Sequence, residues 1–170
     1  MSELDEYVVL DVETTGLDLD RDVIIEIAAI RVVQGEEENR FHVLVRPGRH
    51  LSKKVVELTG ITDDLLESQG IDVAAAMKSF VSFVGDDVVV AHNAAFDCGF
   101  VQAMCEECDL DDFDNECVDT VALAKKRLPG APDYRLKTLL ALLDLDNERP
   151  HRAESDCEAT LALYRKLIKM

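Results

Sequence analysis

The sequence predicts an α/β fold in which helices cover a mixed sheet. Its first half holds three strand-like stretches in succession, Tyr7–Glu13, Val23–Val33 and Arg40–Arg46. Its second half alternates short apolar strands with segments whose apolar residues recur at the helical period of about 3.6 residues. Strands that come first as a meander and then alternate with helices are typical of such a sheet. The 170 residues suit one domain, residues 1–170, with a proper core.

The first strand carries two carboxylates on one face. Tyr7–Glu13 is rich in β-branched and aromatic residues, and Gly16 ends the run in a turn. Because side chains alternate across a strand, Asp11 and Glu13 point to the same side as Val9. At about 4 Å, two such charges repel by roughly 4 kcal/mol at an effective dielectric near 20. A divalent metal with oxygen ligands would remove this repulsion, whereas on a solvated edge face none would be needed.

The next two strands predict an antiparallel hairpin. Val23–Val33 reads as a long strand, and the polar segment Gln34–Asn39, which holds Gly35, is expected to be the connecting loop. Arg40–Arg46 then alternates, with one wholly apolar face. A short loop between two strands gives antiparallel pairing.

Glycines are expected to end the two helical segments that follow. Lys53–Thr59 predicts a short helix closed by Gly60, and Val73–Val84 a longer one closed by Gly85. Asp72 precedes the second segment and is a suitable N-cap.

The rest of the chain alternates between the two kinds of element. The expected segments are a strand at Val88–Ala91, a helix that follows His92–Asp97 and continues through Met104, a short strand at Cys117–Val118, and helices at Thr120–Leu128, Arg135–Leu143 and about Ala153–Lys169.

Composition excludes several classes of protein. Lys plus Arg number 18 against 35 Asp plus Glu, a net charge of −17, which is the wrong sign for holding nucleic acid by charge alone. A nucleic-acid partner would have to be bound through metals and a local basic patch. The odd number of cysteines, five, and the absence of a signal-peptide pattern at Met1–Glu6 predict reduced thiols in a cytoplasm. No apolar run approaches the roughly 20 residues of a membrane span, so no membrane partner is expected.

Two further carboxylates and a histidine stand in unusual places. Asp97 follows a buried strand at the start of a helix, and Asp156 shares an apolar helix face with Leu163. An acid on such a face is costly to bury unless it is paired or bound to a cation, although the helix dipole also favours acids in a first turn. His151 precedes Asp156 by five residues, so both can face one site only if His151 lies on the preceding loop.

Three ordered motifs carry a family resemblance. They are Asp11-Val12-Glu13-Thr14-Thr15-Gly16-Leu17, His92-Asn93-Ala94-Ala95-Phe96-Asp97 and His151-Arg152-Ala153-Glu154-Ser155-Asp156. With them the chain resembles the DEDDh family of 3′→5′ exonucleases, and more closely the DnaQ-like proofreading exonucleases of bacterial replicative DNA polymerases. The resemblance covers essentially the whole chain, and none of the five functional positions departs from the pattern.

The resemblance implies a ribonuclease-H-like fold, with a five-stranded mixed sheet whose first three strands are antiparallel. It implies that two divalent ions, Mg²⁺ or Mn²⁺, are held by Asp11, Glu13, Asp97 and Asp156, with Asp11 bridging both. His151 would be the general base for the attacking water, which completes the catalytic set.

The resemblance also implies where the substrate lies. The terminal nucleotide is expected against Thr14, Thr15, Gly16 and Leu17, with Leu17 as a wedge beside the last base. Asn93 and Phe96 of the second motif are expected to contribute to the same binding site.

The expected function is metal-dependent hydrolysis at single-stranded 3′ ends, which releases nucleoside 5′-monophosphates. Two cations roughly 3.5–4 Å apart activate water and neutralise the leaving 3′ oxygen, so the metals, and not the acidic surface, meet the phosphate. The segment Thr59–Thr62 resembles that of the proofreading type, and this resemblance implies DNA as the substrate, a proofreading or repair role and a DNA polymerase as a candidate partner. Exoribonucleases of the oligoribonuclease type share all five residues and are the alternative. A non-catalytic nucleic-acid-binding scaffold is the alternative from another class, and its signature would be a lost metal ligand.

Overall fold

A five-stranded mixed sheet forms the centre of the computed structural model, which describes residues 4–170. Its strands are β1 (Glu6–Thr14), β2 (Ile24–Val33), β3 (Glu36–Leu44), β4 (Val89–Ala91) and β5 (Cys117–Asp119), arranged in the order β3-β2-β1-β4-β5. The first three strands pair antiparallel, whereas β4 runs parallel to β1 and β5 parallel to β4. The expected mixed sheet is confirmed.

The hairpin between β2 and β3 is tighter than the sequence predicts. The prediction of a loop at Gln34–Asn39 is wrong, because only Gln34 and Gly35 separate the strands, with φ of 52° and 82°. A two-residue turn with positive φ matches the twist of the strands that it joins. Residues Glu36–Asn39 belong to β3, where all four are exposed. Since β3 is an edge strand, polar side chains are tolerated there and discourage further pairing.

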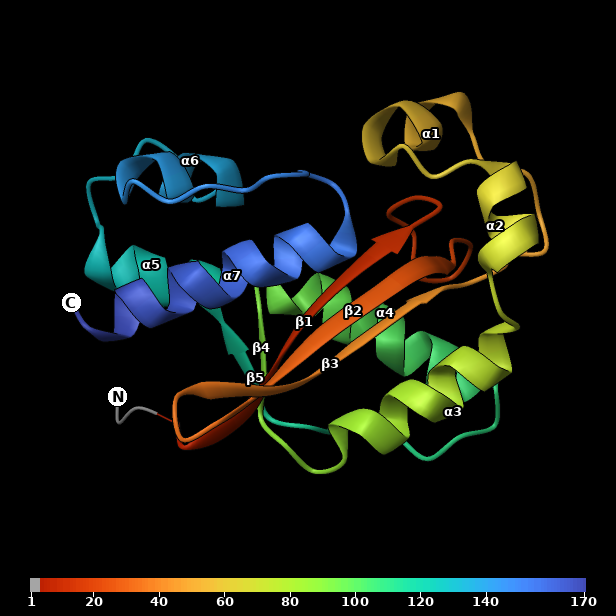
Figure 1. The fold of residues 1–170 in the computed structure, drawn as a ribbon, viewed down its shortest axis with the longest axis horizontal. Coiled ribbons are helices and arrows are strands. Elements are labelled where there is room, and N and C mark those ends of the chain that lie inside the picture. The colour runs from red at the N-terminus through yellow and green to blue at the C-terminus, as the bar shows by residue number, and fades with distance from the viewer. Residues whose placement is uncertain (1–3) are drawn as a thin grey trace.

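Helices cover both faces of the sheet (Figure 1). The helices α3 (Val73–Val84) and α4 (Ala94–Glu107) pack on one face, and α5 (Thr120–Arg127), α6 (Leu136–Leu142) and α7 (Ala153–Ile168) pack on the other. The short helices α1 (Lys53–Thr59) and α2 (Asp63–Gln69) lie beyond the end of β1 in this view. All six helical segments expected from the sequence are present, with ends that differ by one to three residues in some.

The helix ends follow the local sequence signals. Asp72 caps α3, where its side chain accepts hydrogen bonds from the backbone N–H of Ala74 and Ala75. Gly60 closes α1 with φ of 71°, a conformation that glycine adopts without steric cost.

Alternation along β1 sends its side chains into two separate cores. Tyr7 and Val9 pack toward α7, whereas Val8, Leu10 and Val12 pack toward α3 and α4. Asp11 and Glu13 continue the Tyr7–Val9 series, and they therefore face the side of the sheet that α7 covers.

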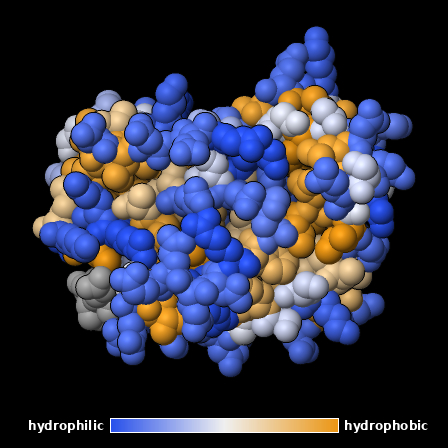
Figure 2. Space-filling model, viewed as in Figure 1, coloured by the Kyte–Doolittle hydropathy of each residue, from blue (hydrophilic) through white to orange (hydrophobic). Residues whose placement is uncertain are grey.

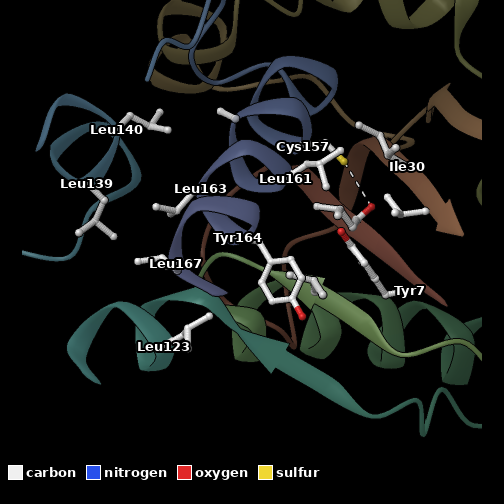
Figure 3. Close-up of a cluster of buried hydrophobic side chains, with 14 of the residues drawn as sticks. Tyr7, Ile30, Leu123, Leu139, Leu140, Cys157, Leu161, Leu163, Tyr164 and Leu167 are labelled. Carbon is white, nitrogen blue, oxygen red and sulfur yellow. Dashed lines mark hydrogen bonds between the residues drawn. The ribbon is translucent and has the colours of Figure 1, made fainter. Parts of the chain in front are cut away.

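Figure 3 shows the core between β1 and α7. The rings of Tyr7 and Tyr164 meet edge to face with centroids 5.1 Å apart. The thiol of Cys157 donates a hydrogen bond to the Val9 carbonyl at 3.3 Å. These contacts fix α7 against β1, and with it the acid at position 156.

The surface is mainly hydrophilic on the face shown in Figure 2, with apolar patches between the charged side chains. Within residues 4–170, no helix has the length and apolar character needed to cross a membrane. All five cysteines are free thiols.

Candidate active site

Four carboxylates from three elements meet where β1 passes between α4 and α7. Asp97 of α4 is buried, and its Oδ1 accepts a hydrogen bond from the Val12 N–H at 3.0 Å, between the two acids of β1. The charges of Asp97 and Asp156 both act on Asp11. The three motifs, separated by long stretches of sequence, are therefore brought to one place.

The tightest part of this cluster consists of Glu13, His151 and Asp156. One potential ligand atom from each of these three side chains lies within 4.8 Å of the other two. Asp11 and Asp97 are not members of this group, and electrostatic interaction connects them to it. It is the one group of three or more possible ligands found between residues 4 and 170.

The turn between β4 and α4 places Asp97. Asn93 adopts a left-handed conformation with φ of 67°, which asparagine tolerates better than most residues. The backbone N–H groups of Asn93 and Ala94 donate to Asp119 Oδ1 at 2.9 and 3.4 Å. The turn is thereby tied to the end of β5, and Asp97 falls in the first turn of α4.

His92 of the second motif helps to hold the turn between β4 and α4. Its Nδ1 lies 2.8 Å from Thr120 Oγ1, at the start of α5. Burial lowers the pKa of His92 below its usual range, so the ring is neutral near pH 7. The histidine joins the β4–α4 turn to α5.

The loop before α7 folds over Asp156. The backbone N–H of His151 donates to Asp156 Oδ2 at 3.0 Å, and the Asn147 side-chain amide donates to Oδ1. His151 has φ of 63° and an exposed side chain. The expectation that His151 lies on the loop and not in the helix is confirmed.

A fifth carboxylate, Glu26 of β2, anchors this loop. Arg152 donates to both Glu26 oxygens at 2.7 to 3.2 Å, and the Ala153 N–H donates to Oε2 at 2.9 Å. His42 Nε2 lies 2.8 Å from Oε1. Burial alone would raise the pKa of Glu26, but the hydrogen bonds from His42, Arg152 and Ala153 outweigh it and lower the pKa to about 2. Glu26 is fully buried and charged.

Glu26 and Asn147 were missed by sequence reasoning. Glu26 is a single acid within the apolar run Ile24–Ile30, which is the same signal that singled out Asp156. Asn147 stands in a polar loop, and nothing in the sequence marks it.

Unlike Glu26, none of the four acids of the site accepts a hydrogen bond from a cationic side chain within residues 4–170. Burial, followed by the charge of Asp97, raises the pKa of Asp11 well above its usual range. Burial and the charge of Asp156 raise the pKa of Glu13 to about 8. Burial is also the main cause of the raised pKa values of Asp97 and Asp156. Convergent carboxylate oxygens of this kind fit hard divalent cations.

The turn after β1 is held rigidly beside the acids. Thr15 Oγ1 donates to Asp22 Oδ1 at 2.9 Å, and the Thr14 hydroxyl donates to the Gly16 carbonyl. A Cβ at Gly16 would lie 2.2 Å from Asp22 Oδ2, so a larger residue would displace the carboxylate to which Thr15 is hydrogen-bonded. Leu17 follows with 82% of its surface exposed.

The two substrate-binding candidates of α4 differ in exposure. Asn93 is exposed at the β4–α4 turn, and Phe96 is half-buried with its ring 4.9 Å from that of Phe100. Both stand within four residues of Asp97.

The chain matches known exonucleases along most of its length. The exonuclease family model RNase_T matches residues 8–164. The sequence is 44% identical over 164 residues to the PolC-type DNA polymerase III of Listeria welshimeri and 41% identical over 168 residues to that of Bacillus subtilis. These matches cover 96% and 98% of this chain but only 11% and 12% of the polymerases, so the chain spans about a ninth of their length.

Solved structures share the fold. Escherichia coli Exonuclease I in complex with a dA16 oligonucleotide has a TM-score of 0.84 at 22% identity, over 98% of this chain and 41% of that one. Exonuclease X in complex with 5′ overhanging duplex DNA has a TM-score of 0.72 at 27% identity, over 96% and 91%.

Proposed function

Because this chain belongs to the RNase_T exonuclease family, we propose that it removes nucleotides from single-stranded 3′ ends of DNA and releases nucleoside 5′-monophosphates. The observation that carries the proposal is the convergence of Asp11, Glu13, Asp97, Asp156 and His151 from a strand, two helices and a loop. Burying four neighbouring carboxylates without cationic partners costs free energy, and bound cations would remove that cost.

The metal ligands in this proposal are the four carboxylates, which would hold two Mg²⁺ or Mn²⁺ ions. Such ions, when bound, activate water and stabilise negative charge on the leaving 3′ oxygen. The side chains must be deprotonated to act as ligands, and the raised pKa of Glu13, about 8, means that protons compete with the cations for the site.

His151 acts as the general base in this scheme. Its ring is exposed, so it can return the proton taken from water to the solvent. The backbone of His151 is fixed by Asp156 at 3.0 Å, and the following residue, Arg152, is bound to buried Glu26. A base held on both sides is kept within reach of the attacking water, which is the geometric condition for proton transfer.

The terminal nucleoside lies against Thr14, Thr15, Gly16 and Leu17, with Asn93 and Phe96 beside the acids. The exposure of Leu17 supports its use as a wedge against the last base. The PolC-type relatives support DNA as the substrate, a proofreading or repair role and association with a polymerase. The five free thiols support a reducing, cytoplasmic setting. Residues 1–170 would work as a single exonuclease domain.

Matched single strands of DNA and RNA test the proposal. Strands labelled at the 5′ end should shorten from the 3′ end with Mg²⁺ or Mn²⁺, stop in EDTA, and yield 5′-monophosphates by mass spectrometry. Faster degradation of RNA would favour the exoribonuclease alternative. Cutting of a circular single strand would identify an endonuclease, and binding without turnover would identify a scaffold.

A further inference from the structure

The turn after β1 is closed by the carboxylate of Asp22. Its Oδ1 accepts a hydrogen bond from the Thr15 hydroxyl at 2.9 Å, and its Oδ2 accepts one from the Asp18 N–H at 3.0 Å. The hydroxyl oxygen of Thr15 in turn accepts a hydrogen bond from the Val23 N–H at 3.1 Å. One carboxylate therefore joins the residues on either side of the pair Gly16–Leu17.

Asp22 also packs directly against this turn. The three atoms nearest to a Cβ at Gly16 would all belong to the Asp22 carboxylate, at 2.2, 2.5 and 2.7 Å. Gly16 is not one of the glycines with positive φ. The carboxylate, rather than the backbone conformation, is therefore what limits a side chain at this position, and the places of Gly16 and Asp22 depend on each other.

Asp22 is charged at neutral pH. The hydrogen bond from the Asp18 N–H is the main cause that holds the pKa of Asp22 below its usual range, and Thr15, Arg49 and the Leu17 N–H lower the pKa as well. A charged acceptor makes stronger hydrogen bonds than a neutral one. The turn is therefore held by charge-assisted hydrogen bonds.

The loop that carries Asp22 is attached to two other parts of the fold. It lies beyond the arrowhead of β1 in Figure 1. Arg49 donates from Nη1 to the Arg21 carbonyl at 2.6 Å, which joins the loop to the segment after β3. The methyl groups of Leu19 would lie 3.5 Å from a Cβ at Gly99, so Leu19 packs over α4, the helix that supplies one acid of the site. These contacts give Asp22 a fixed place relative to the carboxylates.

Leu17 depends on this support for its own direction. With 82% of its surface exposed, its side chain gains little orientation from packing against the protein. Its direction is set instead by the backbone of the turn, which Asp22 holds.

We infer that Asp22 is a positioning residue of the exonuclease, which fixes the turn Thr15–Leu17 and thereby sets how Leu17 meets the last base. The inference rests on the proposed function, in which the terminal nucleoside lies against this turn. It assigns the geometry of that binding site to a residue outside the three motifs, which acts through the turn and not through contact with the substrate.

Two single-stranded DNA oligomers separate this role from a general effect on the fold. They differ only at the 3′ end, where one carries an ordinary nucleoside and the other an abasic tetrahydrofuran unit with a free 3′ hydroxyl. The rate at which this last unit is removed is measured with Mg²⁺ or Mn²⁺. Asp22→Ala should lower kcat/KM on the ordinary end by roughly 10- to 100-fold, mainly through a higher KM. The loss on the abasic end should be much smaller, because that end offers Leu17 no base.

Two single variants serve as controls. Asp22→Asn keeps the shape of the side chain and one acceptor oxygen, so its loss should be smaller and again largely confined to the ordinary end. Asp20→Ala removes the same charge from an exposed position in the same loop. It retains the backbone N–H that donates to Asp18 Oδ1, and it should leave the rates on both oligomers unchanged.

A double-mutant cycle tests the close approach of Gly16 and Asp22. In the parent, Gly16→Ala displaces the carboxylate and should lower kcat/KM on the ordinary end. In the Asp22→Ala background the carboxylate is gone, so the same change should cost far less.

Several results would overturn the inference. They are equal losses on the two ends, an Asp22→Ala variant that behaves like Asp20→Ala, fully multiplicative effects of Gly16→Ala and Asp22→Ala, or a parent with equal kcat/KM on both ends. In each of these cases removal of the last unit by the parent would leave the exonuclease function standing. A parent that removes neither unit with Mg²⁺ or Mn²⁺ would overturn both.

Discussion

Replacing Glu26 by glutamine removes a buried charge and keeps the shape of the side chain. In the protein Glu26 is fully buried and is bound by Arg152, His42 and the Ala153 N–H. Its pKa is lowered from 4.5 to about 2, and each tenfold change in proton affinity corresponds to about 1.4 kcal/mol. The charged form should therefore stabilise the fold by roughly 3 kcal/mol at pH 7.

The pH dependence of this contribution has a definite sign. The pKa of Glu26 is lower in the folded than in the unfolded chain, so the stabilisation is complete above about pH 5 and is lost as the pH falls toward 2. Urea unfolding of the parent and Glu26→Gln, both in EDTA, should differ by roughly 3 kcal/mol at pH 7 and by much less at pH 3. The control is Glu158→Gln, which removes an exposed acid paired with Arg40 and should cost about 0–1 kcal/mol.

The same variant tests whether Glu26 affects catalysis by positioning the loop that carries His151. Glutamine at position 26 should bind Arg152 less tightly than glutamate does. The neighbouring His151 would then be misplaced, and kcat should fall by roughly 10- to 100-fold. In a His151→Ala background, Glu26→Gln should have little further effect on kcat, because the base that it positions is gone. Equal stability of parent and Glu26→Gln at pH 7, or a full additional loss of kcat in the His151→Ala background, would refute the reasoning.

Three further predictions concern the acids and the base of the site. Asp11→Ala should abolish turnover yet melt no lower than the parent in EDTA, because it removes a carboxylate that burial and Asp97 disfavour; activity within tenfold of the parent would contradict a two-metal site. His151→Ala should lower the maximum rate by roughly 100-fold or more with nearly unchanged Mn²⁺ affinity in a titration, whereas a large loss of affinity would make His151 a ligand. The pKa of Glu13 is raised to about 8, so Mn²⁺ affinity should rise as the pH rises through 8. A flat profile between pH 6 and 9 in calorimetry would contradict that value.

What the sequence predicted best depends on short-range rules. Alternation along β1 is enough to place Asp11 and Glu13 on one face, and Asp72 and Gly60 mark helix ends through contacts within a few residues. The last helix was expected to begin at about Ala153, which leaves His151 on the preceding loop, and this position is confirmed.

What it could not predict depends on contacts between distant segments. Glu26 and its partner Arg152 are 126 residues apart, so an acid in an apolar strand could not be assigned a cation from sequence alone. The segment Glu36–Asn39 looked like a loop because it is polar, but polarity there reflects the edge position of β3 in the sheet. A cavity beside α6 is formed by four separate segments, none of which signals it alone.

Two glutamates that are paired across β1 and β2 show how an acid of the candidate site differs from the acid that anchors the loop before α7. Glu13 and Glu26 are partners in the strand register, yet the pKa of one is raised to about 8 and that of the other is lowered to about 2. Burial acts on both, so the difference comes from their partners. Glu26 receives hydrogen bonds from Arg152, His42 and a backbone N–H, whereas Glu13 faces other acids and gains only a minor contribution from Arg152. The protein supplies a cation to Glu26, the acid that holds the loop, whereas in the proposed site Glu13 would obtain its cation from solution.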